Sequence, residues 1–413
     1  MNQRISLTPL FMTVFLDLLG LSIIIPIVAP LFLYPESGIL PATVSFSVRT
    51  LLLGLLITSY PLAQFFGAPI IGGLSDQHGR KKMLLASLAG TFLGYSLFAV
   101  GVLTHSILLL FFSRIFGGFM GGNIAVALSS IADVSDEESK TRNFGLVGMA
   151  FGLGFIIGPY IGGKLADPLL VSWFSFATPF WFAALLALFN IVLVLLVFKE
   201  TLHTSIHTKI SIFTGIRNII RAFHFTHLRV IFIVVFFLTF GFTFFAQFFQ
   251  VFLIEKFQYT QSQIGDLFAY IGVWIAFTQG FITRPVSRVF APARVLAFSI
   301  ILLATAIFTL LFPSHAFFLY FLLPFVAIFH GLTVPNYTTI ISNLSSKDSQ
   351  GEIMGIHQSI QSLAQAIPPL IAGVVVAVNS SLPIILAALC SVAAWVVFIL
   401  FFKERKEQLF HEV

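Results

Sequence analysis

Charged residues are scarce in this chain. Asp, Glu, Lys and Arg make up only 9% of its 413 residues, whereas about a quarter of a soluble domain is charged. Hydrophobic residues make up 58% of the chain and the mean hydropathy is +1.01, so polar side chains are too few to cover a soluble globule. Many apolar stretches of roughly 20 residues can each cross a ~30 Å hydrocarbon core as a helix. The composition therefore predicts an all-α polytopic membrane protein.

Sequence signals of catalysis are also absent. The single cysteine, Cys390, excludes a disulfide framework. The chain has no Gly-Lys-Ser/Thr phosphate loop, no His-Glu-x-x-His pair, no metal-spaced histidines and no Gly-x-Ser-x-Gly elbow. We therefore expect no enzyme activity, no cofactor and no metal. The sequence pI is about 9.5, but the basic residues are dispersed over loops, so we expect no nucleic-acid partner.

Twelve membrane spans are expected along the chain. A polar linker at 199–228 separates a six-span bundle at 1–198 from a second at 229–402, and a tail follows at 403–413. The predicted spans are 8–32, 49–74, 83–103, 107–132, 143–165, 178–198, 229–254, 263–284, 294–312, 317–343, 353–377 and 383–402.

The distribution of lysine and arginine predicts the orientation. One side of the predicted spans holds nearly all of them, and the other side holds only Arg49, Lys164 and Lys256. Cytoplasmic loops carry the excess of positive charge, so we expect both termini in the cytoplasm. Linker residues 210–222 are amphipathic, which is typical of a helix on the anionic inner leaflet, although a plain basic tether is the alternative.

Two glycine-containing motifs stand out. The fifth predicted span contains Gly154-Phe-Ile-Ile-Gly158-Pro159-Tyr-Ile-Gly162-Gly163. Small residues there allow two membrane helices to approach closely, and a proline bends its helix. The loop after the second span reads Gly72-Gly-Leu-Ser-Asp76-Gln-His-Gly79-Arg80-Lys-Lys, and glycines in such a loop permit a tight turn.

These motifs resemble those of the drug:proton antiporters of the major facilitator superfamily, in the twelve-span, tetracycline-exporter-like branch. The resemblance implies two pseudo-symmetric six-helix bundles that alternate access to a midplane site. A faint internal repeat, which aligns 135–145 with 345–355, agrees with it. The resemblance also implies a conformational latch of charges, for which the alternative is a set of solvated charges at helix ends. The latch residues would be Gly72, Asp76, Gly79 and Arg80 together with Asp133 at the end of the fourth span.

Two ionisable residues lie inside predicted spans, where charge is costly and therefore suggests function. Asp17 lies about nine residues into the first span and Arg114 about seven into the fourth, so both reach a similar depth. We predict that they couple transport to protons, with Asp17 as the carrier. The alternative is a static buried ion pair. His330 in the tenth span is a weaker candidate for the same role.

Polar side chains in other spans are candidates for lining a substrate cavity, since amides facing lipid would be poorly satisfied. Helix packing alone is the alternative. The candidates are Asn123, Gln247, Gln250, Gln279, Gln358 and Gln361.

The sequence thus predicts a secondary transporter that exports a small, partly lipophilic compound in exchange for protons. Its partners would be that compound, protons and the lipid bilayer, and we expect a monomer. A bacterial cytoplasmic membrane fits a chain of this kind, with an organelle membrane as the alternative. Two other functions remain open: transport of one dedicated metabolite, amino acid or siderophore, with or without proton coupling, and a transport-dead receptor or scaffold on the same fold.

Overall fold

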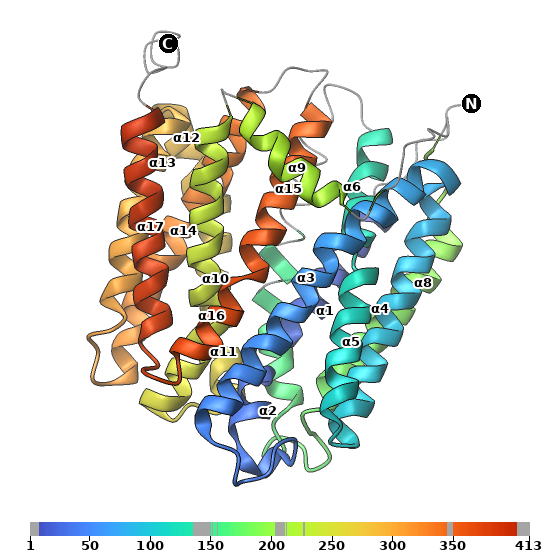
Figure 1. The fold of residues 1–413 in the computed structure, drawn as a ribbon, viewed down its shortest axis with the longest axis vertical. Helices are drawn as coiled ribbons and strands as arrows, with labels where there is room; N and C mark the ends of the chain where they lie inside the picture. The colour runs from blue at the N-terminus through green and yellow to red at the C-terminus, as the bar shows by residue number, and fades with distance from the viewer. Residues whose placement is uncertain are drawn as a thin grey trace. The chain divides into compact units, whose positions relative to one another are not determined.

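The computed structural model describes residues 8–134, 150, 152–154, 156–202, 211, 213–225, 228–344 and 350–402. Every regular element in these ranges is a helix (Figure 1). The predicted tail at 403–413, linker residues 203–210 and the repeat segments at 135–145 and 345–349 lie outside the described residues.

The helices follow the predicted spans closely. In the N-terminal half they are α1 (Thr8–Ile23), α2 (Ile25–Leu33), η1 (Pro35–Ser37), α3 (Phe46–His78), α4 (Arg80–Leu103), α5 (Ile107–Met120), α6 (Asn123–Asp133), residues 156–165 of the fifth span, and α8 (Thr178–Val197). After the linker helix α9 (Thr214–His224) come α10 (Arg229–Phe257), α11 (Gln261–Phe277), η2 (Thr278–Ile282), α12 (Thr283–Val289), α13 (Pro292–Thr309), η3 (Ala316–Phe318), α14 (Leu319–Asn343), α15 (Gln350–Ala366), α16 (Pro368–Val375) and α17 (Leu382–Phe401).

Ten stretches of helix in the described residues are long and apolar enough to cross a membrane. The other two predicted spans are present in pieces. Of the fifth span the structure describes residues 150, 152–154 and 156–165, and the eleventh is divided into α15 and α16. The prediction of an all-α, twelve-helix membrane protein is confirmed.

Several spans are broken at or just before proline, which lacks a backbone N–H donor, or at glycine, which lacks a side chain. The first span breaks at Ile24, just before Pro26, and the eleventh breaks just before Pro368. Proline lacks the amide hydrogen that the previous turn would accept. The fourth span breaks at Gly121 and Gly122, between α5 and α6. Such breaks persist in a membrane only where neighbouring groups satisfy the freed backbone.

The chain forms two compact units, each with its own hydrophobic core. The first comprises Met1–Ser45, Ser59–Thr214 and Thr260–Ala269, and the second comprises Phe46–Thr58, Gly215–Tyr259 and Tyr270–Val413. A core of the first unit gathers around Val14 and Leu18 of α1. A core of the second gathers around Ile231 of α10, Ile340 of α14 and Ile356 of α15.

Helices α3 and α5 of the first unit touch backbone to backbone. A methyl group on Gly118 would overlap the carbonyl oxygen of Tyr60, and one on Gly67 would overlap that of Phe119. A methyl group on Gly355 of α15 would meet no atom within 4 Å. The first two glycines are therefore needed for packing, whereas Gly355 is not.

We predict that Gly118→Ala destabilises the protein and Gly355→Ala does not. Overpacking costs about 1–3 kcal/mol, while alanine in an open helix position gains roughly 0.5–1 kcal/mol over glycine. The unfolding temperature of the purified protein in detergent measures both effects. Equal unfolding temperatures for the two variants would contradict the close contact of α3 with α5.

Candidate functional site

The charged loop between α3 and α4 forms a closed cluster in the first unit. Arg80 Nη1 lies 2.5 Å from Asp76 Oδ1, and Arg80 Nε lies 2.9 Å from Asp133 Oδ2. Arg80 Nη1 also donates to Ser75 Oγ at 2.7 Å. The arginine is only 6% exposed, so its guanidinium is held by neighbouring side chains rather than by water. The three charged residues of the predicted latch are thus joined through Arg80.

The glycines of this loop have different roles. Gly79 lies at the junction of α3 and α4 and has φ +100°. Residues other than glycine rarely adopt this backbone conformation. A methyl group on Gly72 would meet no atom within 4 Å. The turn therefore requires Gly79, and nothing in the described residues crowds Gly72.

Glu200, which follows α8, completes the cluster and was not predicted. Its carboxylate accepts hydrogen bonds from the backbone N–H groups of Arg80 at 2.9 Å and Lys81 at 3.1 Å, the first residues of α4. Partial burial raises the pKa of Glu200, but bonds from four backbone N–H groups outweigh it and lower the pKa below its ordinary 4.5. Thr201 Oγ1 donates to Asp133 Oδ2 at 3.3 Å. The segment that follows α8 thus contacts both the first residues of α4 and Asp133 of α6.

Asp17 lies in the middle of α1, beside the first residue of α6, where the fourth span is broken. Asn123, the first residue of α6, is within hydrogen-bonding reach of its carboxyl group, and Asp17 Oδ2 is buried with no hydrogen-bond partner among the described residues. A helix N-terminus carries partial positive charge and favours an anion. The break between α5 and α6 therefore gives the Asp17 carboxylate a local source of stabilisation.

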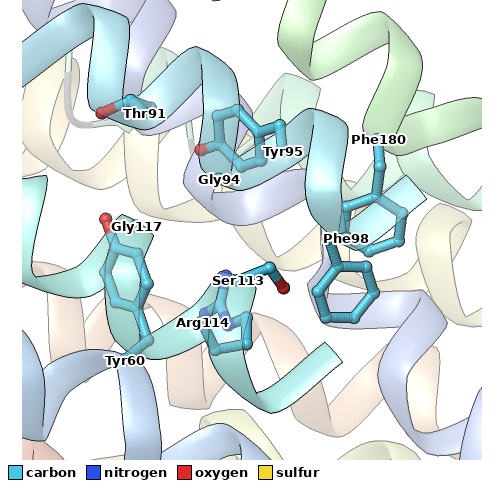
Figure 2. A pocket seen from close by; sticks show the side chains of 9 residues that line it. All are labelled: Tyr60, Thr91, Gly94, Tyr95, Phe98, Ser113, Arg114, Gly117 and Phe180. Atoms are coloured by element: carbon cyan, nitrogen blue, oxygen red, sulfur yellow. The ribbon is translucent and has the colours of Figure 1, made fainter. Parts of the chain in front are cut away.

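Arg114 of α5 lines a small cavity in the same unit. Its guanidinium carbon lies 4.3 Å from the centre of the Tyr60 ring, a cation–π arrangement. The cavity has about 10 Å³ of free volume, the room of roughly one water. Figure 2 shows Tyr60 at one end of the lining and the ring pair Phe98–Phe180 at the other. The lining residues are Tyr60, Thr91, Gly94, Tyr95, Phe98, Ser113, Arg114, Gly117 and Phe180.

Asp17 and Arg114 do not form an ion pair in the described residues. Tyrosines occupy the space around them. A methyl group on Gly20, one turn beyond Asp17, would lie 2.9 Å from the Tyr95 hydroxyl, and one on Gly121 would lie 2.8 Å from the Tyr60 hydroxyl. The static ion pair that the sequence left open is therefore not present in this conformation.

The glycine motif of the fifth span packs directly on α1. Methyl groups on Gly158 and Gly162 would overlap Ser22 Oγ and the carbonyl oxygen of Ile23, and one on Gly154 would lie 2.8 Å from Leu18 Cβ. Ser22 Oγ donates to the Gly154 carbonyl at 2.8 Å. The motif therefore fixes the fifth span against the helix that carries Asp17.

The last residues of the motif face α11 instead. A methyl group on Gly163 would lie 3.1 Å from Gly265 Cα, and one on Gly265 would lie 2.6 Å from the carbonyl oxygen of Pro159. Next to this contact Lys164 Nζ lies 2.8 Å from Asp266 Oδ2 and 2.9 Å from Ser262 Oγ. The fifth span thus has one face on α1 and a second, charged contact on α11.

The candidate residues of the second unit are dispersed. His330 stacks on Phe242, with ring centres 3.6 Å apart and planes 8° apart. Gln250 is fully buried and donates to the Gln247 carbonyl of its own helix at 2.9 Å. Gln361 Nε2 donates to the Tyr337 hydroxyl at 3.1 Å.

The remaining two cavity candidates, Gln279 and Gln358, are exposed. None of the six predicted cavity residues lines the cavity at Arg114. Their assignment to a substrate site stays a prediction.

Four residues of the first unit belong to these contacts without having been predicted. Tyr60 and Tyr95 line the cavity at Arg114, Gln64 donates to the Gly121 carbonyl at 2.8 Å, and Glu200 joins the latch. A tyrosine or glutamine in an apolar span carries no motif, so the sequence alone gave no signal for the first three. Glu200 follows a predicted span, but its partners are 120 residues away in sequence.

Comparison with known proteins agrees with this architecture. The sequence model of the Major Facilitator Superfamily matches residues 10–251 and 231–411. The class G tetracycline resistance protein of Vibrio anguillarum is 30% identical over 363 residues, or 86% of each chain. The quinolone resistance protein NorA of Staphylococcus aureus (strain MRSA252) is 27% identical over 426 residues, or 99% of each chain.

A solved structure shows the same fold. The crystal structure of the human organic anion transporter MFSD10 has a TM-score of 0.70 and 22% identity, and the match covers 96% of this chain and all of that one. Because the sequence model covers nearly the whole chain and the helices follow the expected spans, this protein belongs to the Major Facilitator Superfamily of multi-pass membrane transporters.

Proposed function

We propose that this protein exports a small, partly lipophilic compound in exchange for protons by alternating access. The observation that carries the proposal is the Asp17 carboxyl group, which lies within a span and has one buried oxygen without a hydrogen-bond partner in the described part of the chain. A buried carboxylate is stable only when neutralised or supplied with partners. Its protonation therefore depends on what faces it, which is the property that a proton carrier needs.

Arg114 is the group that would change the protonation of Asp17. In the described conformation its cation rests on Tyr60 rather than on a carboxylate, which leaves Asp17 free to hold a proton. A movement that brings Arg114 toward Asp17 would favour the carboxylate and release the proton. Two relatives are named as tetracycline and quinolone resistance proteins, and this similarity supports export of a drug-like compound. His330 remains a weaker candidate because it stacks on an aromatic ring.

Proton movement can supply enough energy for this function. One charge that moves down ~100 mV releases about 2.3 kcal/mol, enough for roughly a fifty-fold gradient of a neutral compound. The latch of Asp76, Arg80 and Asp133 would hold one conformer during each cycle. We assign the protein to a bacterial cytoplasmic membrane, in keeping with the bacterial relatives.

We predict that Asp17→Asn abolishes proton-driven export while Glu36→Gln, at an exposed external turn, does not. Asparagine matches the shape of aspartate but carries no titrating proton. Ethidium or Hoechst accumulation in efflux-deficient cells, with and without an uncoupler, measures export. Wild type should lower accumulation only without uncoupler. Export by Asp17→Asn equal to wild type would remove Asp17 as the carrier, and no export by any form would favour a dedicated metabolite as substrate.

We predict that Arg80→Lys slows transport nearly as much as Arg80→Gln. Arg80 uses two different nitrogens for Asp133 and Asp76, and a lysine ammonium cannot reproduce that fork. Loss of one charged hydrogen bond costs about 1.5–3 kcal/mol, or roughly tenfold or more in the population of the latched conformer. Initial transport rates in proteoliposomes measure the effect. Wild-type rates for Arg80→Lys would show that only the charge matters.

We predict that Glu200→Gln lowers the unfolding temperature at neutral pH and that this difference disappears in acid. Because the folded-state pKa of Glu200 is lowered, its stabilisation is fully present above the ordinary 4.5 and is lost as pH falls through the lowered value. The difference between wild type and variant should stay constant from about pH 8 to about pH 5. A difference that grows on acidification would contradict the capping role.

A further inference from the structure

The linker helix α9 presents three distinct faces. One face, formed by the buried Gly215 and Ala222 and the half-buried Asn218, packs on α15 and the core of the second unit. Asn218 Nδ2 donates to Ser359 Oγ of α15 at 3.1 Å. Ala222 belongs to the same core as Ile353 and Ile356 of α15. The spacing of three and four residues places these side chains on one side of the helix, so α9 is fixed to the second unit (Figure 1).

A second face is apolar and exposed. Phe213, Ile216, Ile220 and Phe223 are 59%, 40%, 54% and 60% exposed, and they follow one another at helical spacing. Four large apolar side chains in one stripe are unusual on a surface that faces water. This stripe therefore calls for an apolar environment outside the chain.

A third face is basic and adjoins the apolar stripe. Arg217, Arg221 and His224 recur at four and three residues and are exposed, and α9 contains no acidic residue. An apolar stripe beside arginines is the pattern of a helix that lies in the plane of an anionic membrane surface.

The position of α9 in the second unit agrees with such a surface. Four residues separate it from α10, which begins at Arg229. The hydrophobic core that α9 joins through Ala222 also contains Leu228 and Ile231, at the start of α10, and Ile341, near the end of α14. These are the ends of spans whose loops carry the excess of positive charge, so α9 lies at the level of the inner headgroups.

We propose that α9 is a lipid-binding helix whose apolar stripe inserts into the inner leaflet and whose arginines bind the phosphates of anionic phospholipids. This lipid-binding surface is separate from the proposed transport site, and the proposal does not depend on which compound the protein transports. The bond from Asn218 to Ser359 attaches the lipid-bound helix to α15.

The test uses the full-length protein in nanodiscs and single cysteines in a Cys390→Ser background, which removes the one native thiol. Bimane is attached at Ile220→Cys or Phe223→Cys. Leu196→Cys on α8, 79% exposed, is the membrane control, and Glu36→Cys is the aqueous control. Nitroxide near the headgroup of phosphatidylglycerol reports lipid contact, and iodide reports water.

We expect the lipid nitroxide to quench positions 220 and 223 like position 196, and iodide to quench position 36 alone. Arg217→Gln should lower the ratio of lipid-bound to unbound α9 about fivefold, because it removes one positive charge near an anionic surface. The quenching by the lipid nitroxide should weaken accordingly. Arg217→Lys and the distant Arg288→Gln should keep it. Strong iodide quenching at 220 and 223 would overturn the proposal. Quenching by neither agent would also overturn it, because protein would then cover the stripe.

Discussion

The hydrocarbon core offers no water to bind polar groups, and the rest of this structure depends on that constraint. Each helix break must satisfy its own freed backbone, as Gln64 does for the Gly121 carbonyl. The unsatisfied oxygen of Asp17 therefore has high chemical significance. Within a span its surroundings come from other helices, such as α6 with Asn123, so they depend on how those helices pack.

A second group of charges lies at the junctions of helices. Arg80 binds acids from α3 and from the end of α6, and Glu200 caps α4 from the end of α8. Four segments are thus joined through one buried guanidinium and one carboxylate, by charge-assisted hydrogen bonds, which are stronger than neutral ones.

Within the spans, glycine allows helices to pack by direct backbone contact rather than through charged side chains. The motif of the fifth span brings that helix against the backbone of α1 without intervening side chains. Such packing leaves no room for a side chain between α1 and the fifth span. The helix that carries Asp17 is therefore held by close packing, while the latch and the contact of Lys164 with Asp266 depend on charge. The close backbone contacts and the charged contacts of this chain thus use different chemistry.

The sequence by itself determined the class, the number of spans and the family resemblance, because hydropathy and motif spacing are local properties that the bilayer enforces. Through that resemblance it also singled out Asp76, Arg80 and Asp133, which the structure brings into contact. It also located Asp17 and Arg114, since charge inside a span is rare. It did not determine their partners. The ring of Tyr60 under Arg114, the Asn123 amide beside Asp17 and the Glu200 cap on α4 all join residues far apart in the chain. Only the tertiary structure decided these contacts, because helix rotation and the breaks at glycine and proline set which side chains face one another.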